Sequence, residues 1–177
     1  MKAPKTITHE RRLVDVAEPL ATFLGECGAL GDRLGPLLIQ LPPSLKFDPE
    51  PVERFLSVWR EATTAASVLE PRHDSWFLPQ ADALLDAFRV ARVAADPAVI
   101  PDAASPGGWP GLTYRRLRGS QTIYKTSYDD GRLEALASQM AEEQSPEAWV
   151  IFDNTQRSAA TTDALKLMAS NSPAPAR

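Results

Sequence analysis

The stretch from Pro36 to Glu70, PLLIQLPPSLKFDPEPVERFLSVWREATTAASVLE, decides the fold class. It opens with the apolar run Pro36–Leu41 and closes with a second apolar run, Ala66–Leu69. Between them, apolar side chains recur from Val52 to Trp59 at the spacing i, i+3, i+4, i+7, which places them on one face of an amphipathic helix. Two buried strands joined by a helix form a unit in which the strands run parallel, so the stretch predicts an α/β protein.

The same alternation continues along the rest of the chain. Further helices with this apolar spacing are predicted at Leu20–Cys27, Ala81–Phe88, Leu133–Met140 and, from weaker residues, Thr161–Met168. Further strands are predicted at Ala91–Ala95, Leu112–Leu117 and Trp149–Phe152. Prolines and glycines between positions 97 and 111 disfavour a helix there and predict a long loop instead. About five parallel strands therefore form either an open doubly wound sheet or part of an eight-strand barrel, and the pattern does not choose between them.

Capping residues predict where helices begin and end, and chain length and composition predict the domain boundaries. Pro19 suits the first turn of a helix, Asp48 suits a cap before Pro49, and Gly28 suits a helix end. The 177 residues fit one domain, predicted over 1–169, and the proline-containing, mostly polar segment 170–177 is expected to be a disordered tail.

Charge and residue usage exclude several function classes. The net charge of −4 argues against a nucleic-acid partner. A single cysteine, Cys27, permits no internal disulfide, and with two histidines it makes a structural zinc site improbable. No nucleotide-binding or metalloprotease motif is present, so no cofactor and no metal are expected. Without an apolar leader or a long apolar run, we expect a cytoplasmic protein that does not enter a membrane.

Polar side chains close the predicted strands. In either architecture the ligand site lies at the carboxyl ends of the strands. Because side chains alternate along a strand, Glu70 and Arg72 share one face, as do Tyr114, Arg116 and Arg118. The polar residues expected to converge at one rim are Gln40, Glu70, Arg72, His73, Asp96, Arg116, Arg118, Asp153 and Asn154.

This residue set suggests a pocket for a small anionic metabolite. Guanidinium groups bind carboxylates and phosphates through paired hydrogen bonds, so Arg72 and Arg116 are the expected anchors. Glu70 or His73 is the candidate acid or base. Gln40, Arg118 and Asn154 complete the predicted substrate-binding set.

Each of these residues also has a structural interpretation. Glu70 and its arginines can form an ion-pair network that only completes the rim. His73 can cap the turn that follows it, and Gln40 can satisfy backbone groups at the strand end. Asp153 and Asn154 can cap the last helix, and His9 reads as part of a solvated loop.

Several strings, taken together, resemble the YecE-like family, domain of unknown function 72. They are Ile7–Leu13 (ITHERRL), Leu34–Ser44 (LGPLLIQLPPS), Glu70–His73 (EPRH), Ser75–Phe77 (SWF), Arg116–Gly119 (RLRG), Tyr124–Tyr128 (YKTSY) and Phe152–Asn154 (FDN). The resemblance implies a TIM-type (β/α) barrel, and since a complete barrel needs about 250 residues, it implies that the first strands are missing here.

The resemblance carries residues but no reaction. The positions that match the family's strings are Glu70, Arg72, His73, Arg116 and Asn154. The chain departs from the family's pattern at Pro71, usually aromatic, at Arg118, usually histidine, and at Asp153, usually asparagine. Two hypotheses follow: an uncharacterised barrel protein with an enzyme-like pocket, or a non-catalytic truncated barrel whose open sheet edge is covered by a partner or a second copy.

Overall fold

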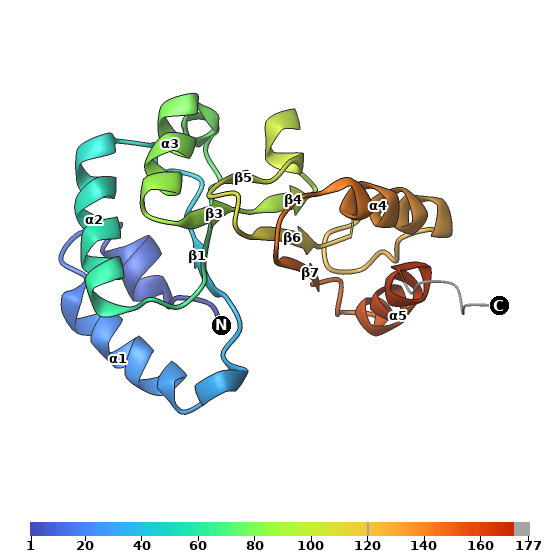
Figure 1. The fold of residues 1–177 in the computed structure, drawn as a ribbon, viewed down its shortest axis with the longest axis horizontal. Helices are drawn as coiled ribbons and strands as arrows, with labels where there is room; N and C mark the ends of the chain where they lie inside the picture. Colours follow the sequence, from blue (N-terminus) through green and yellow to red (C-terminus); the bar gives the residue numbers. More distant parts are fainter. Residues whose placement is uncertain (120, 172–177) are drawn as a thin grey trace.

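The structure, a computed structural model, describes residues 1–119 and 121–171. Parallel strands and helices alternate along the chain, and a few short helical turns lie between them (Figure 1). In chain order the elements are η1 (Thr6–Glu10), α1 (Ala17–Gly28), η2 (Gly31–Arg33), β1 (Leu37–Gln40), α2 (Pro49–Ala62), β2 (Ser67–Glu70), η3 (Asp74–Phe77), α3 (Pro79–Ala87), β3 (Val90–Arg92), β4 (Ala94–Asp96), η4 (Pro101–Ala104), β5 (Gly107–Gly108), β6 (Thr113–Leu117), α4 (Asp130–Glu142), β7 (Ala148–Phe152) and α5 (Ala159–Asn171).

The strands lie side by side in the order in which they occur along the chain. β1, β2 and β3 are parallel neighbours in a four-stranded sheet, in which the short β5 runs antiparallel to β3, and β4, β6 and β7 are parallel neighbours in a three-stranded sheet that continues it. β3 and β4 are two parts of one stretch, interrupted at Val93, whose N–H donates to the carbonyl of Leu69 at 2.9 Å. The chain therefore steps from strand to neighbouring strand in one direction, whereas a doubly wound sheet reverses its order.

The predicted elements are confirmed, with differences at their ends. Each apolar stripe lies in a helix, except that Phe88 directly follows α3, and each apolar run contains strand residues. α1 begins two residues before Pro19, and Asp48 precedes α2 without a side-chain capping bond. The predicted long loop carries η4 and β5. α5 continues through Asn171, two residues into the predicted tail, and 172–177 lie outside the described residues.

The first three strands have the larger core. Figure 1 shows α1, α2 and α3 gathered around this half of the sheet. Phe55 and Trp59 on α2 are fully buried, and the Trp59 indole N–H donates to the Ser67 hydroxyl at 2.9 Å. All four residues of β2 are buried, as expected for a parallel strand that is covered on both faces.

The second half of the sheet is less covered. α4 and α5 pack on its outer face through residues that include Leu133, Leu136 and Leu167. β7 begins with two exposed residues, Ala148 and Trp149, so this edge strand is open to solvent. The indole of Trp149 reaches the chain just before β1, because a Cβ placed on Gly35 would lie 2.9 Å from its Cη2 atom. Since β1 and β7 are the outermost strands of the series, this contact shows that the sheet curves.

Arg60 links the amino ends of β2 and β3 to α2. Its Nε donates to the carbonyl of Phe88 at 2.7 Å, its Nη2 to that of Arg89 at 2.8 Å, and its Nη1 to that of Ala65 at 2.9 Å. Burial, and to a lesser extent the charge of Arg89, lower the pKa of Arg60. One side chain thus satisfies carbonyl groups in the two segments that lead into β2 and β3.

None of the helices among residues 1–119 and 121–171 combines the length and the apolar character needed to span a bilayer.

Candidate functional site

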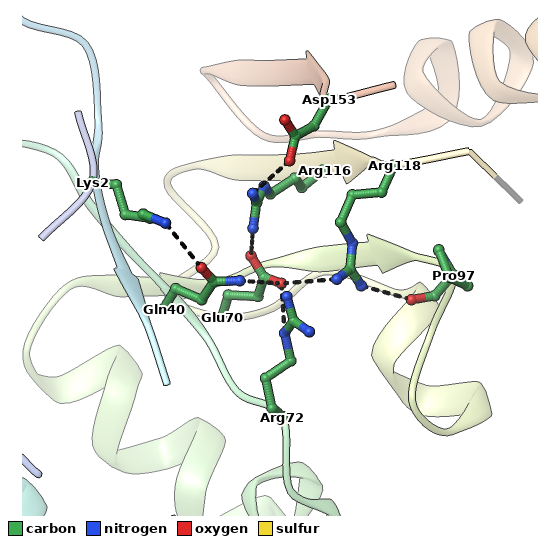
Figure 2. Close-up of polar contacts among 8 residues, drawn as sticks. All are labelled: Lys2, Gln40, Glu70, Arg72, Pro97, Arg116, Arg118 and Asp153. Atoms are coloured by element: carbon green, nitrogen blue, oxygen red, sulfur yellow. Dashed lines mark hydrogen bonds and ion pairs between the residues drawn. The ribbon is translucent and has the colours of Figure 1, made fainter. Parts of the chain in front are cut away.

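Six polar side chains meet where β1, β2, β6 and β7 end (Figure 2). We call them the mouth cluster: Gln40, Glu70, Arg72, Arg116, Arg118 and Asp153. They meet because residues at alternate positions of parallel strands face the same side of a sheet and the carboxyl ends of these strands share one edge. The sequence prediction had placed all six at this rim, five of them as site residues.

Glu70 is the centre of the mouth cluster. Its side chain is fully buried, and its Oε1 accepts from Arg72 Nε at 2.9 Å while its Oε2 accepts from Arg116 Nη1 at 2.7 Å. Arg118 Nη1 lies 4.0 Å from Oε1. A buried carboxylate is stable only when it is paired in this way, so both oxygens are committed to the arginines.

Arg116 joins the two carboxylates of the mouth cluster. Its Nη2 donates to Asp153 Oδ2 at 2.6 Å, while its Nη1 donates to Glu70. Burial lowers the pKa of Arg116, but Glu70 and then Asp153 raise it by more, so the pKa lies above its usual value. Arg116 is therefore a permanent cation that links β2, β6 and β7.

Arg118 is the least satisfied member of the mouth cluster. Its residue is 3% exposed, and its Nη2 donates to the carbonyl of Pro97 at 3.0 Å. Its Nε is buried and has no hydrogen-bond partner among residues 1–119 and 121–171. A charged donor that is removed from water without a partner is costly, so an acceptor at this position would stabilise the cluster.

Gln40 connects the mouth cluster to the N-terminal segment. Its Oε1 accepts from Lys2 Nζ at 3.3 Å, and its Nε2 lies 3.5 Å from Glu70 Oε1. In the reversed orientation of the amide, its oxygen accepts from Arg116 Nη1 at 2.9 Å and from Arg72 Nη2 at 2.5 Å. An amide can serve either pattern because it carries both donors and an acceptor.

Tyr114 lies on the same face of β6, two residues before Arg116. Burial raises the pKa of Tyr114 to about 12; Arg116 opposes this rise, and the carboxylates of Glu70 and Asp153 add to it. The phenol is therefore protonated at neutral pH. Its hydroxyl makes no hydrogen bond to the described residues, and it is thus available to a ligand.

His73 takes the local role that its structural interpretation predicted. Its Nδ1 accepts from the backbone N–H of Ser75 at 3.2 Å, which caps η3, and lies 2.7 Å from Asp74 Oδ1. No bond joins it to the mouth cluster. Asp96 also lies outside the cluster, since it pairs with Arg132 at 3.2 Å.

Asn154 supports the site from behind. Its fully buried side chain donates through Nδ2 to Asp163 Oδ2 at 2.7 Å and to the carbonyl of Thr126 at 2.9 Å. Asp163 also accepts from the hydroxyl of Ser127 at 2.5 Å and from the N–H of Tyr128. These bonds hold the connection between β6 and α4, which begins next to Arg118, and they leave Asn154 away from the cluster.

Two residues of this region were absent from the predicted site. Asp153 could have been assigned to the site by alternation. It lies two residues after Ile151, the register partner of Arg116, and so faces the same side of the sheet, whereas Asn154 faces the other side. Lys2 enters the site because the first residues pair with β1, where Ala3 N–H donates to the carbonyl of Leu38 at 2.9 Å. No local sequence pattern announces that pairing.

Charges in this region do not balance. Lys2, Arg72, Arg116 and Arg118 bring four positive charges, and Glu70 and Asp153 bring two negative charges. The mouth cluster together with Lys2 therefore carries an excess of two positive charges.

A separate cavity lies at the opposite end of β6. Its volume is about 680 Å³, and it is lined by 106–113 and 143–146, with no residue of the mouth cluster among them. Within the part of the chain that the structure describes, no three His, Cys, Asp or Glu side chains come together as a metal-binding group.

Residues 1–176 match the family described as protein of unknown function DUF72. The chain belongs to this family. It is similar to the crystal structure of a DUF72 family protein from Thermotoga maritima, with a TM-score of 0.79 and 24% identity over 95% of this chain and 71% of that one. It is also similar to a DUF72 family protein from Enterococcus faecalis, with a TM-score of 0.73 and 20% identity over 89% of this chain and 66% of that one. No curated protein matches it.

Family membership confirms the resemblance that the sequence strings had suggested. At these identities, the likeness to the solved DUF72 structures shows the fold alone, a mixed α/β arrangement of parallel strands and helices. The function of the family is uncharacterised, so a function for this chain must be argued from the mouth cluster itself.

Proposed function

We propose that the mouth cluster of this DUF72 protein binds a small anionic metabolite that carries a carboxylate or phosphate group. The observation that carries the proposal is the buried Arg118 guanidinium, whose Nε has no acceptor in the part of the chain that the structure describes. An anionic oxygen at this position would complete the site and offset the excess of positive charge around Glu70.

Several donors of the site remain available to such an anion. Arg72 is 20% exposed and uses only its Nε for Glu70. The Tyr114 hydroxyl is protonated and makes no hydrogen bond to the described residues. The Lys2 ammonium group lies at the β1 side of the mouth cluster, where it donates to Gln40. These groups can donate to a ligand oxygen while both oxygens of Glu70 keep their arginine partners.

Glu70 serves best as the residue that positions the arginines. The sequence suggested Glu70 or His73 as an acid or base, but both Glu70 oxygens accept bonds from guanidinium groups. The His73 ring caps η3 beside Asp74. The proposal therefore assigns Glu70 a positioning role, Arg72, Arg116 and Arg118 the binding of the anion, and Asn154 the support of the neighbouring loop.

The proposal extends to the architecture of the sheet that carries the mouth cluster. We infer that the curved sheet is a five-strand portion of a TIM-type (β/α) barrel, whose sites lie at the carboxyl ends of the strands. Three observations support this inference: the chain order of the strands, the contact of Trp149 with the chain at Gly35, and the similarity to longer DUF72 structures.

The test compares arginines of one strand that face opposite sides of the sheet. Inorganic phosphate and a panel of phosphorylated and carboxylated metabolites should raise the melting temperature, because a ligand that binds only the folded state stabilises it. Arg116→Gln and Arg118→Gln should each remove that rise. Arg115→Gln is the matched control, since Arg115 pairs with Glu143 on the outer face, and it should keep the rise.

Two outcomes would contradict anion binding. One is the absence of any shift across the panel; the other is an equal loss of the shift in the Arg115 control. If Arg116→Gln fails to fold because Glu70 loses its partner, the double variant Glu70→Gln with Arg116→Gln removes both charges together and carries the same prediction.

A further inference from the structure

The short helix η1 lies beside the carboxyl end of β1, on the border of the mouth cluster. The chain enters it from the residues that pair with β1, and it leaves through Arg12, whose Nη1 and Nη2 donate to the hydroxyl and carbonyl of Ser44 at 3.0 and 2.9 Å. Ser44 belongs to the connection that follows β1. Ile7 and Thr8 are buried, so η1 is fixed at this place.

His9 is held on this helix with one ring nitrogen free. Its Nδ1 lies 2.8 Å from the hydroxyl of Thr8, which is 1% exposed. Its Nε2 has no partner among the described residues. The ring therefore has a set orientation and one nitrogen that can exchange a proton with solvent or with a ligand.

The charged groups that act on His9 are mostly cations, and two of them belong to the site. Among the described residues they are Lys5, Lys2 and Arg72, and Glu10 opposes them. Lys2 reaches Gln40 from one side, and Arg72 reaches the same amide in its reversed orientation. His9 thus belongs to the same positively charged region as the proposed anion site.

We propose that His9 is a further residue of this site, uncharged in the free protein and protonated when a ligand with two negative charges occupies the mouth cluster. The inference rests on the proposed anion binding and narrows the ligand class to dianions such as a phosphate monoester. A carboxylate with one charge would protonate His9 to a smaller extent.

Electrostatics supports this coupling. Burial lowers the pKa of His9 below its ordinary 6.5, Lys5, Lys2 and Arg72 lower it further, and Glu10 opposes them. A bound dianion cancels part of the cationic field, so the pKa of His9 rises and a proton is taken up.

The experiment is an NMR titration of the two histidine rings of the full chain, with His9→Gln used to assign them. Sulfate is the probe, since it keeps both charges over the whole pH range, and chloride at equal ionic strength is the reference. In chloride the midpoint of His9 should lie below 6.5. In saturating sulfate it should rise by about one unit, a tenfold gain in proton affinity.

A second variant tests the electrostatic contact without any ligand. Lys2→Met removes one of the cations that face His9, so the His9 midpoint in chloride should rise. An unchanged midpoint would show that His9 does not face the cations of the site, and it would overturn the inference.

The two proposals fail in distinguishable ways. If sulfate raises the melting temperature through Arg116 but leaves the His9 midpoint unmoved, anion binding stands and the role of His9 is overturned. If sulfate, phosphate and the metabolite panel do not bind at all, both are overturned.

Discussion

The two halves of the sheet differ in how they are covered and in what they contribute to the mouth cluster. The half formed by β1, β2 and β3 packs against three helices, and every residue of β2 is buried. The half formed by β4, β6 and β7 has two helices and an exposed edge at β7. The first supplies Gln40, Glu70 and Arg72, and the second supplies Arg116, Arg118 and Asp153. The larger core thus lies in one half, while the more buried cations of the mouth cluster, Arg116 and Arg118, stand on the other.

Phe55→Ala should have the largest effect on this comparison. Phe55 is 1% exposed and contacts Trp59 in the core of the first half, so its truncation should lower the free energy of unfolding by about 4 kcal/mol. Leu133→Ala, in the smaller core under α4, should lower it by about 2 kcal/mol. Urea unfolding measures both, and an equal or larger loss in Leu133→Ala would show that the two halves are equally well packed.

Glu70→Ala should have the next largest effect, because Glu70 pairs with Arg116 across the two halves. Removal of one partner from a buried ion pair costs about 3 kcal/mol here, at the lower end of the usual range because Arg72 is partly exposed and can be hydrated. Asp153→Ala is the control, with a loss below about 1 kcal/mol, since Asp153 is 28% exposed. If chemical unfolding shows the same loss of unfolding free energy in Glu70→Ala and Asp153→Ala, Glu70 is not the central residue of the cluster.

Gly35→Ala should have the smallest effect on stability and still report on the curvature of the sheet. The added methyl would lie 2.9 Å from Trp149 Cη2, and the partly exposed indole can move away for less than about 1 kcal/mol. The emission of Trp149 should change, measured against the same substitution with Trp149→Phe. Gly25→Ala, which meets no atom within 4 Å, should leave the emission unchanged. A similar spectrum in both variants would argue that Trp149 does not rest on the chain before β1.

Periodicity predicted the fold because burial imposes it. A helix that covers a sheet must place residues such as Val52 and Trp59 on one face, and a buried strand such as β2 must be apolar on both. The shared face of Glu70 and Arg72, and that of Tyr114, Arg116 and Arg118, follow from the same geometry of alternation.

The rest of the site depends on contacts that local patterns do not encode. Lys2 and the carbonyl of Pro97 join the cluster through chain pairing and loop path, and neither has a distinctive spacing in the sequence. His73 shows the converse, because a histidine next to a strand end looks functional until its bond to Ser75 is seen. Asp153 and Asn154 are neighbours in sequence, but their side chains face opposite sides because strand side chains alternate. Asp153 therefore accepts from Arg116 in the mouth cluster, whereas Asn154 donates to Asp163 outside it.

Arg60 gives the first half a cooperative character. Its guanidinium closes the turn after α2 and the entry to β3 at the same time, so neither connection can open without leaving carbonyls and a partly buried cation unsatisfied. Local opening, which usually proceeds one loop at a time, is here tied to the release of both. We therefore expect the segments that lead into β2 and β3 to open together, so that a contact at the amino end of β2 also affects the position of Glu70 at its carboxyl end.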